Sequence, residues 1–258
     1  MYYQLEREFF ITQRIKSMDS IIFVGANSDI AKATLALLGA TKNVILLTRD
    51  ANKLPHDIQS QYECHSCNPC QHEDLTKCFE SILAQHSIQS VVNFCGNIML
   101  KPAGTLTLAD WQQTIDINLT TAFNVAHVTT KNVKKDCSLI FFSTAAAHIG
   151  LPNHEAIAAA KAGIEGLSKS IAASYAKQNI RSNVIAPGLI QSNLSTPITT
   201  SERGKALSLS IHGLNRLGEP KDIASMVKWL LDSDNNWITG EVIRIDGGLS
   251  TTKCYPNH

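Results

Sequence analysis

The sequence predicts a single α/β domain in which a doubly wound parallel sheet has helices on both faces. From Ser20 onward, short apolar runs alternate with helix-like segments, an order typical of parallel sheets. The 258 residues could form one large domain or two small ones. No linker-like shift in composition and no internal repeat divides them, which favours one domain.

The strands and helices follow from the spacing of apolar residues. Strands are predicted at Ile21–Val24, Val44–Leu47, Val91–Phe94, Leu139–Phe142, Arg181–Ile185 and Val242–Ile245, with a weaker one around Tyr62–His65. Helices are predicted at about Asp29–Leu38, Glu73–Gln85, Ala109–Lys131, His154–Lys177 and Pro220–Leu231. The stretch from Leu189 to Glu219 lacks a clear period, and we interpret it as a loop covering a substrate cleft.

Composition excludes several classes of protein. Apolar residues make up 44% and charged residues 17%, as in ordinary globular proteins. A net charge of +1 predicts no nucleic-acid partner, and no apolar run approaches the roughly 20 residues of a membrane span. Residues 1–17 are charged throughout and are expected to be an extension before a domain at 18–258. Seven cysteines, an odd number, favour a reducing compartment, and we expect a cytoplasmic protein.

The first strand runs into a glycine-containing turn that opens a helix, Gly25-Ala26-Asn27-Ser28-Asp29-Ile30. The backbone N–H groups and the positive helix end at such a turn can hold a pyrophosphate. Asp29 has two interpretations: the N-cap of the helix, or a residue of the phosphate site whose negative charge lowers cofactor affinity.

The second strand ends in Leu-Leu-Thr-Arg-Asp. An acidic residue at this point favours NAD by binding the ribose 2′-hydroxyl, whereas an arginine accommodates the 2′-phosphate of NADP. Arg49 therefore predicts NADP over NAD. A solvated Arg49-Asp50 turn without a cofactor role is the alternative.

The central stretch of the chain joins a buried strand to an alanine-rich helix. The apolar run Leu139–Phe142 ends at the hydroxyl pair Ser143-Thr144, and a loop follows. Asn153 is a plausible N-cap for the helix, from whose middle Lys161 projects.

This stretch resembles the catalytic segment of the short-chain dehydrogenase/reductase family, which has a Ser at the strand end and Tyr-x-x-x-Lys on the helix. Ile157 fills the Tyr position, four residues before Lys161. The resemblance extends from Ser20 to about Ser250 and implies a Rossmann-like domain that binds NAD or NADP.

The resemblance also implies catalytic roles. In the family, Tyr exchanges a proton with the substrate oxygen, Lys lowers the Tyr pKa and binds the ribose, Ser orients the substrate, and Asn holds a water. Asn118, Thr144 and Lys161 match the Asn, Ser and Lys. Since isoleucine cannot exchange a proton, His154, one turn before Ile157, is the candidate substitute acid. A solvent-exposed histidine in the first helical turn is the alternative.

Further motifs imply the cofactor contacts. Asn93-Phe94-Cys95-Gly96 is similar to the family's Asn-Asn-Ala-Gly. The segment from Pro187 to Ser192 is similar to the family's Pro-Gly-x-x-x-Thr. The family's Thr-Gly-x-x-x-Gly-x-Gly is matched only at Gly25. The implied cofactor residues are Gly25, Asn27, Ser28, Asp29, Ile30, Arg49, Asn93, Gly96, Lys161, Pro187, Gly188, Ile190 and Ser192.

The segment from Cys64 to Cys70 contains the spacing Cys-x-x-Cys-x-x-Cys, which invites a metal interpretation. No second cysteine pair follows, so we predict free thiols and no metal. Ser66 or Asn68 is then a candidate contact for the adenine.

Two functions remain open. The first is an NADP-preferring oxidoreductase with a changed proton donor, acting on the carbonyl or alcohol group of a small molecule. The second is a cofactor-binding sensor or partner protein without turnover. The small residues Ala158, Ala162, Gly163 and Gly166 would let the Lys161 helix pack against a second copy, so a homodimer or homotetramer is expected.

Overall fold

The computed structural model describes residues 19–39 and 42–253, so the expected extension at 1–17 lies outside the described residues. Its parallel strands form one seven-stranded sheet in the order β3-β2-β1-β4-β5-β6-β7, which confirms the doubly wound class. The strands are β1 (Asp19–Val24), β2 (Asn43–Thr48), β3 (Glu63–Ser66), β4 (Ser87–Asn93), β5 (Cys137–Phe142), β6 (Ile180–Pro187) and β7 (Val242–Ile245). The winding reverses between β1 and β4, and a crevice at the carboxyl ends of the strands forms at such a reversal.

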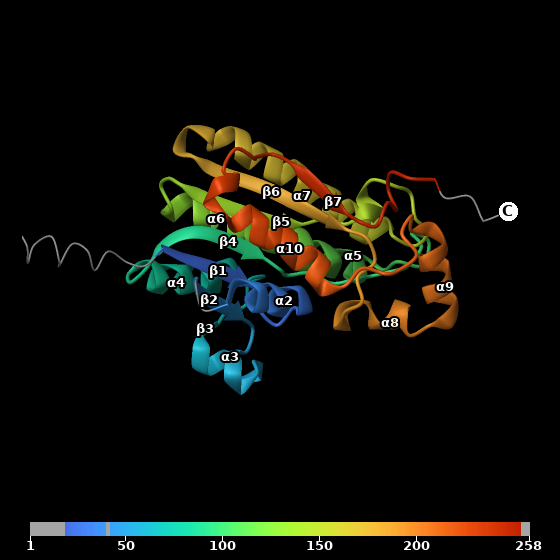
Figure 1. Cartoon of the computed structure of the whole chain (residues 1–258), viewed down its shortest axis with the longest axis horizontal. Helices are drawn as coiled ribbons and strands as arrows, with labels where there is room; N and C mark the ends of the chain where they lie inside the picture. Colours follow the sequence, from blue (N-terminus) through green and yellow to red (C-terminus); the bar gives the residue numbers. More distant parts are fainter. Residues whose placement is uncertain (1–18, 40–41, 254–258) are drawn as a thin grey trace, which may run out of the picture.

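Helices cover both faces of the sheet (Figure 1). One face carries α2 (Asp29–Leu38), α3 (His56–Gln61) and α10 (Pro220–Leu231). The other carries α4 (His72–Leu83), α6 (Thr121–Asn132) and α7 (Glu155–Ser174), and α5 (Leu108–Ile115) packs against α7. The short helices α8 (Thr196–Thr199) and α9 (Glu202–Ile211) lie at one end of the molecule, beyond the strands (Figure 1).

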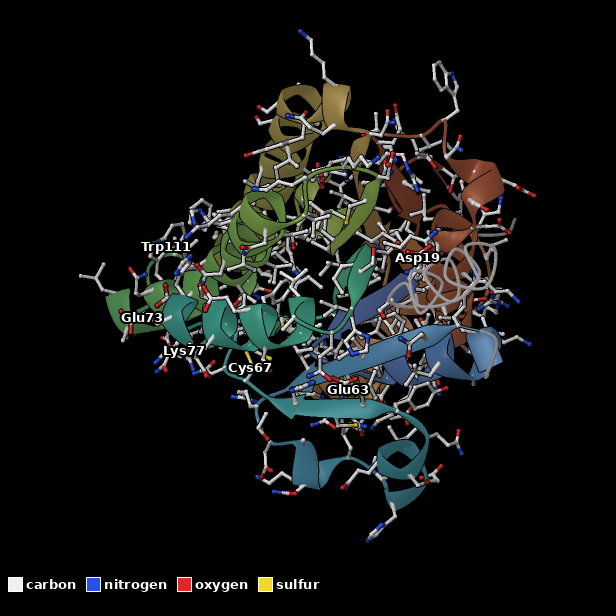
Figure 2. The ribbon with its side chains drawn as sticks, turned by 90° about the vertical axis from the view of Figure 1, so that its left-hand side faces the viewer. Asp19, Glu63, Cys67, Glu73, Lys77 and Trp111 are labelled. Atoms are coloured by element: carbon white, nitrogen blue, oxygen red, sulfur yellow. The ribbon has the colours of Figure 1, made fainter. Side chains whose placement is uncertain are left out.

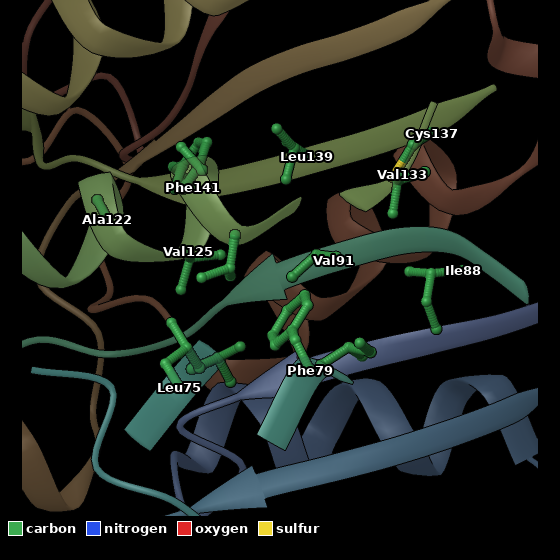
Figure 3. Packing of buried hydrophobic residues seen from close by; sticks show 14 of the residues in the cluster. Leu75, Phe79, Ile88, Val91, Ala122, Val125, Val133, Cys137, Leu139 and Phe141 are labelled. Atoms are coloured by element: carbon green, nitrogen blue, oxygen red, sulfur yellow. The ribbon is translucent and has the colours of Figure 1, made fainter. Parts of the chain in front are cut away.

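The sheet packs against its helices through two apolar cores, one on each face. Alternate residues of β1 point to opposite faces: Ile22 joins the core beneath α4, α6 and α7, while Phe23 joins the core beneath α2 and α10. Figure 3 shows Leu75 and Phe79 of α4 directed toward Val91 of β4 in the first core. Because both faces are covered, the strands read as nearly continuous apolar runs, which is why they were detectable in the sequence.

Three elements differ from the sequence prediction. The helix α3 was not predicted. The helix expected over Ala109–Lys131 is present, since helical backbone runs without a gap from Leu108 to Asn132, but a π-helical turn at Asp116–Thr120 divides it into α5 and α6. The stretch from Leu189 to Glu219, here called the cover segment, contains α8 and α9 rather than loop alone. None of the α9 residues is buried, so the helix leaves no core-facing apolar period in the sequence.

Within residues 19–39 and 42–253, no helix combines the length and the apolar character needed to cross a membrane.

Candidate active site

A cavity of about 410 Å³ opens at the carboxyl ends of the strands, where the winding reverses. Its walls come from the β1–α2 turn, the exits of β4, β5 and β6, the start of α7, and the cover segment. Several of the expected site residues border it: Ser28, Ile30, Gly96, Thr144, His154, Lys161, Pro187, Gly188, Ile190 and Ser192. Residues far apart in the sequence thus meet around one space.

Lys161 lies in the second turn of α7 and is the buried cation of the cavity. Its Nζ donates a hydrogen bond of 3.0 Å to the carbonyl oxygen of Phe142, at the end of β5. Burial lowers the pKa of this lysine to about 8. Gly96 leaves room for it, because a Cβ at that position would lie 3.3 Å from Nζ and 3.1 Å from Oδ1 of Asn118.

Asn118 owes its place to the π-helical turn between α5 and α6. Within this turn, Nδ2 of Asn118 donates a bond of 2.9 Å to the carbonyl oxygen of Thr114. Nδ2 of Asn118 also donates to Oδ1 of Asn97 at 2.6 Å, and Oδ1 of Asn118 accepts from the Asn97 N–H at 3.3 Å. Asn97 was not among the predicted site residues, although its position directly after Gly96 could have indicated it.

The two hydroxyls after β5 have different environments. Ser143 is buried, and its Oγ donates its one proton to Glu165 Oε1, with the carbonyl oxygen of Lys161 3.3 Å away. Thr144 borders the cavity, and its Oγ1 accepts a bond of 3.3 Å from the Ala146 N–H, which leaves the hydroxyl proton able to donate elsewhere. Both residues border the cavity, but the Ser143 hydroxyl is already bonded to Glu165, whereas the Thr144 hydroxyl proton remains available.

Glu165, a buried carboxylate of α7, was also missed by the sequence analysis. Its Oε1 accepts from Ser143 and lies 3.1 Å from Nε2 of His148, in the loop after β5. The carboxylate thereby joins α7 to the strand end and to the loop that forms a wall of the cavity. Its position four residues after Lys161 places it one turn further along the same helix.

Ile157 and His154 occupy the wall where α7 begins. Ile157 is buried and borders the cavity one turn before Lys161. His154 is half-buried at the N-cap position, with Nδ1 2.7 Å from the carbonyl oxygen of Pro152. If Nδ1 donates there, Nε2 remains for the cavity. The prediction of Asn153 as N-cap is wrong, because this residue precedes the cap with a φ of 66°.

The β1–α2 turn forms a cradle of backbone groups. Gly25 has a φ of 81°, and a Cβ there would lie 2.9 Å from Sγ of Cys95. Asn27 Nδ2 donates to Thr48 Oγ1 at 2.9 Å, which ties the turn to β2. Ser28 is the N-cap of α2 but makes no side-chain capping bond, so the first N–H groups of the helix suit an anion.

The prediction of Asp29 as N-cap is wrong. Asp29 is the first helical residue, and its carboxylate binds Asn193 of the cover segment instead of the helix end.

At the end of β2, the two charged residues have separate environments. Arg49 is exposed directly after the strand. Asp50 caps the following turn by accepting a 3.1 Å bond from the Asn52 N–H. Ser66 Oγ accepts from the Ala51 N–H at 3.0 Å, and Asn68 Oδ1 accepts from the Cys70 N–H at 3.2 Å, while the adenine contact of either residue stays a prediction.

The exits of β4 and β6 complete the site. Asn93 Oδ1 accepts a 3.2 Å bond from the Cys95 N–H and shapes the turn into Gly96. A Cβ on Gly188 would lie 2.8 Å from Nε2 of His212, a buried residue that the sequence analysis missed. His212 accepts from the Leu189 N–H at 3.3 Å and lies 2.5 Å from the Ser208 carbonyl oxygen, which connects the β6 exit to α9.

The described cysteines are free thiols. Cys67 is buried beside α4, at the exit of β3 (Figure 2), and Cys70 Sγ lies 3.3 Å from Thr121 Oγ1. In the part of the chain that the structure describes, no three His, Cys, Asp or Glu side chains are grouped so as to hold a metal ion.

The fold and the position of the cavity place this chain in the class of doubly wound nucleotide-binding proteins. The family described as Enoyl-(Acyl carrier protein) reductase matches residues 25–250. A 3-oxoacyl-[acyl-carrier-protein] reductase of Thermotoga maritima is 30% identical over 244 residues, covering 88% of this chain and 96% of that protein. The chain belongs to the short-chain dehydrogenase/reductase family.

Solved structures have the same architecture. A 4-hydroxyisoleucine dehydrogenase mutant complexed with NADH and succinate is 26% identical with a TM-score of 0.84, over 92% of this chain and 100% of that one. ElxO with NADP bound is 23% identical with a TM-score of 0.84, over 91% of this chain and 100% of that one, and supports the fold alone.

Proposed function

We propose that this protein is an NADP-preferring oxidoreductase that converts a carbonyl group to an alcohol, or the reverse, on a molecule with an apolar chain. The convergence of Lys161, Asn118 and Thr144 beside one cavity is the observation that supports it most strongly. The relative named above is a reductase of acyl groups on a carrier protein, which agrees with this substrate class.

The walls of the cavity favour an apolar substrate. Aliphatic side chains predominate on the side formed by the β4 exit and the cover segment: Ile98, Leu100, Leu194, Ile198, Leu207 and Ile211. Burying an aliphatic chain against them contributes roughly 0.8 kcal/mol per CH₂ group. Thr144 and Lys161 border the same cavity from the β5 exit and α7, so the carbonyl would lie beside them with its chain toward α9.

The proposed mechanism assigns each polar group one task. When bound, the nicotinamide would supply or accept the hydride. The Thr144 hydroxyl donates a hydrogen bond to the substrate oxygen and orients it. The Lys161 ammonium holds the ribose hydroxyls, and the amide of Asn118 holds the turn after Gly96. In its imidazolium form, His154 delivers from Nε2 the proton that Ile157 cannot, while Nδ1–H stays bonded to the Pro152 carbonyl oxygen.

Arg49 supports the preference for NADP, since its exposed guanidinium at the end of β2 is placed to pair with a 2′-phosphate. Asp50, already used as a cap, is less suited to bind a ribose hydroxyl. Related structures contain either NADP or NADH, so the preference depends on this chain's own residues.

A homodimer or homotetramer belongs to the same proposal, as does a cytoplasmic location. Gly163 faces inward, because a Cβ there would lie 2.9 Å from Leu119, whereas Ala162 and Gly166 are exposed on α7. Trp111 and Phe123 expose apolar surface on α5 and α6, and Figure 2 shows Trp111 at the outer surface. Light scattering at micromolar concentration tests the assembly, and a monomer would contradict it.

The test of function separates binding from turnover. NADPH and NADH are titrated by nicotinamide fluorescence, and single-turnover reduction is then measured on ketones that differ only in chain length. Binding with turnover that improves with chain length supports the proposal, and Lys161→Met should abolish the turnover. Binding without turnover on any ketone would favour the sensor alternative, which Ile157 supports, and no binding would contradict both.

A further inference from the structure

The carboxylate of Asp29 connects two segments that lie 164 residues apart in the chain. Its Oδ2 accepts a bond of 2.7 Å from the backbone N–H of Asn193, and its Oδ1 accepts one of 3.0 Å from the Asn193 side-chain amide. Asn193 begins the short turn that leads into α8 and α9. These two residues, here called the Asp29–Asn193 latch, therefore hold the cover segment against the N-terminus of α2.

The Asp29–Asn193 latch lies at the N-terminus of α2, where the phosphates of a dinucleotide would bind. The N-terminus of a helix carries about half a positive charge, which stabilises either a carboxylate or a phosphate. Ser28 leaves this helix end without a side-chain cap. Asp29 also fills a position that the family motif gives to glycine, so a carboxylate lies where related chains have no side chain.

A carboxylate and a phosphate cannot share this position without cost. Both groups only accept hydrogen bonds, so a phosphate at this helix end would compete with the Asp29 carboxylate for the N–H groups of Asn193. Both are negative, and they repel at short range. Lys32 Nζ, 3.9 Å from Asp29, is too exposed to neutralise the carboxylate effectively.

We propose that the Asp29–Asn193 latch and a bound dinucleotide exclude each other. In the empty protein, Asp29 holds the cover segment on α2, and the pyrophosphate of the cofactor takes Asn193 away from it. The inference rests on the proposed dinucleotide binding. Removal of the Asp29 charge therefore has two measurable effects: dinucleotide binds more tightly, and the cover segment of the empty protein becomes looser.

The experiment compares four proteins in an NADPH titration: wild type, Asp29→Asn, Asn193→Ala and Asp234→Asn. Asp29→Asn removes the charge but keeps an acceptor for Asn193. Asp234→Asn is the matched control, because Asp234 is an exposed carboxylate in the turn before β7, at the opposite ends of the strands. We expect the Kd for NADPH to fall about tenfold in Asp29→Asn and less in Asn193→Ala, with no change in the control.

Hydrogen exchange of residues 193–211 in the same proteins without cofactor provides the second readout. We expect faster exchange in Asn193→Ala and a smaller increase in Asp29→Asn, which keeps an acceptor. Thermal unfolding checks that each variant folds.

Three outcomes would overturn the inference. Equal or weaker NADPH binding by Asp29→Asn would overturn the latch and leave dinucleotide binding intact. Faster exchange with unchanged affinity would show a structural contact without competition. Failure of all four proteins to bind NADPH or NADH would overturn the latch together with the proposed function.

Discussion

The ammonium group of Lys161 lies 3.0 Å from the carbonyl oxygen of Phe142, the last residue of β5. This bond directs a charged side chain from α7 toward the end of the strand, next to Thr144. It also keeps the ammonium away from bulk water, with only 7% of the residue exposed. The burial that places Lys161 beside the end of β5 is thus also the cause of its lowered pKa.

That burial predicts how stability depends on pH. Burial lowers the pKa of Lys161 from 10.5 to about 8. Between these values the unfolded chain binds more protons on this lysine than the folded one, so the free energy of unfolding rises with pH. Relative to Lys161→Met, the wild type should gain up to about 3 kcal/mol between pH 7.5 and 10.5, measured by urea unfolding. A difference that does not change with pH would contradict this.

The missing tyrosine is tested by a pair of variants. If Ile157 occupies the proton-donor position, Ile157→Tyr restores a phenol beside Lys161 and should raise carbonyl reduction by roughly 10²-fold. If His154 has taken the role, His154→Ala should abolish native turnover while Ile157→Tyr does little or blocks the substrate. Single-turnover rates distinguish the two cases. Turnover unaffected by His154→Ala and by Lys161→Ala would show that the active site lies elsewhere.

Arg49 is expected to select the phosphorylated cofactor. In Arg49→Ala, affinity for NADPH should fall by about tenfold, while NADH affinity stays the same, because only NADPH loses a charge partner. Calorimetric titration of both cofactors measures the ratio, and Lys53→Ala, another exposed cation after β2, is the control. Equal or tighter binding of NADH by the wild type, together with no effect of Arg49→Ala, would refute the preference.

We expect the buried Glu165 carboxylate to stabilise the fold through its contacts with Ser143 and His148. Glu165→Ala leaves Ser143 and His148 without their shared acceptor and should lower the free energy of unfolding by about 1–3 kcal/mol. Glu155→Ala removes an exposed carboxylate from the same helix, together with its 3.2 Å bond from the Ala103 N–H, and should cost less than about 1 kcal/mol. Urea unfolding compares the two variants. A smaller loss for Glu165→Ala than for Glu155→Ala would show that the buried network contributes no stability.

Much of the fold was predictable because the sheet is covered on both faces. Each buried strand, such as Leu139–Phe142, then appears as an unbroken apolar run, and the alternation with helices indicates parallel connections. The approximate position of the site was predictable for the same reason, since Gly25, Thr144 and Pro187 follow strands and must meet at one edge of the sheet.

The sequence by itself therefore determined the class of fold, the edge at which the site lies and the absence of a tyrosine four residues before Lys161. Only the tertiary structure decided which polar groups pair. The bond between Asp29 and Asn193, the carboxylate of Glu165 behind Ser143 and the contact of Asn97 with Asn118 join residues between 21 and 164 positions apart. Apolar burial depends on a local period that a sequence displays, whereas a hydrogen bond depends on a distance between two atoms that only the folded chain sets.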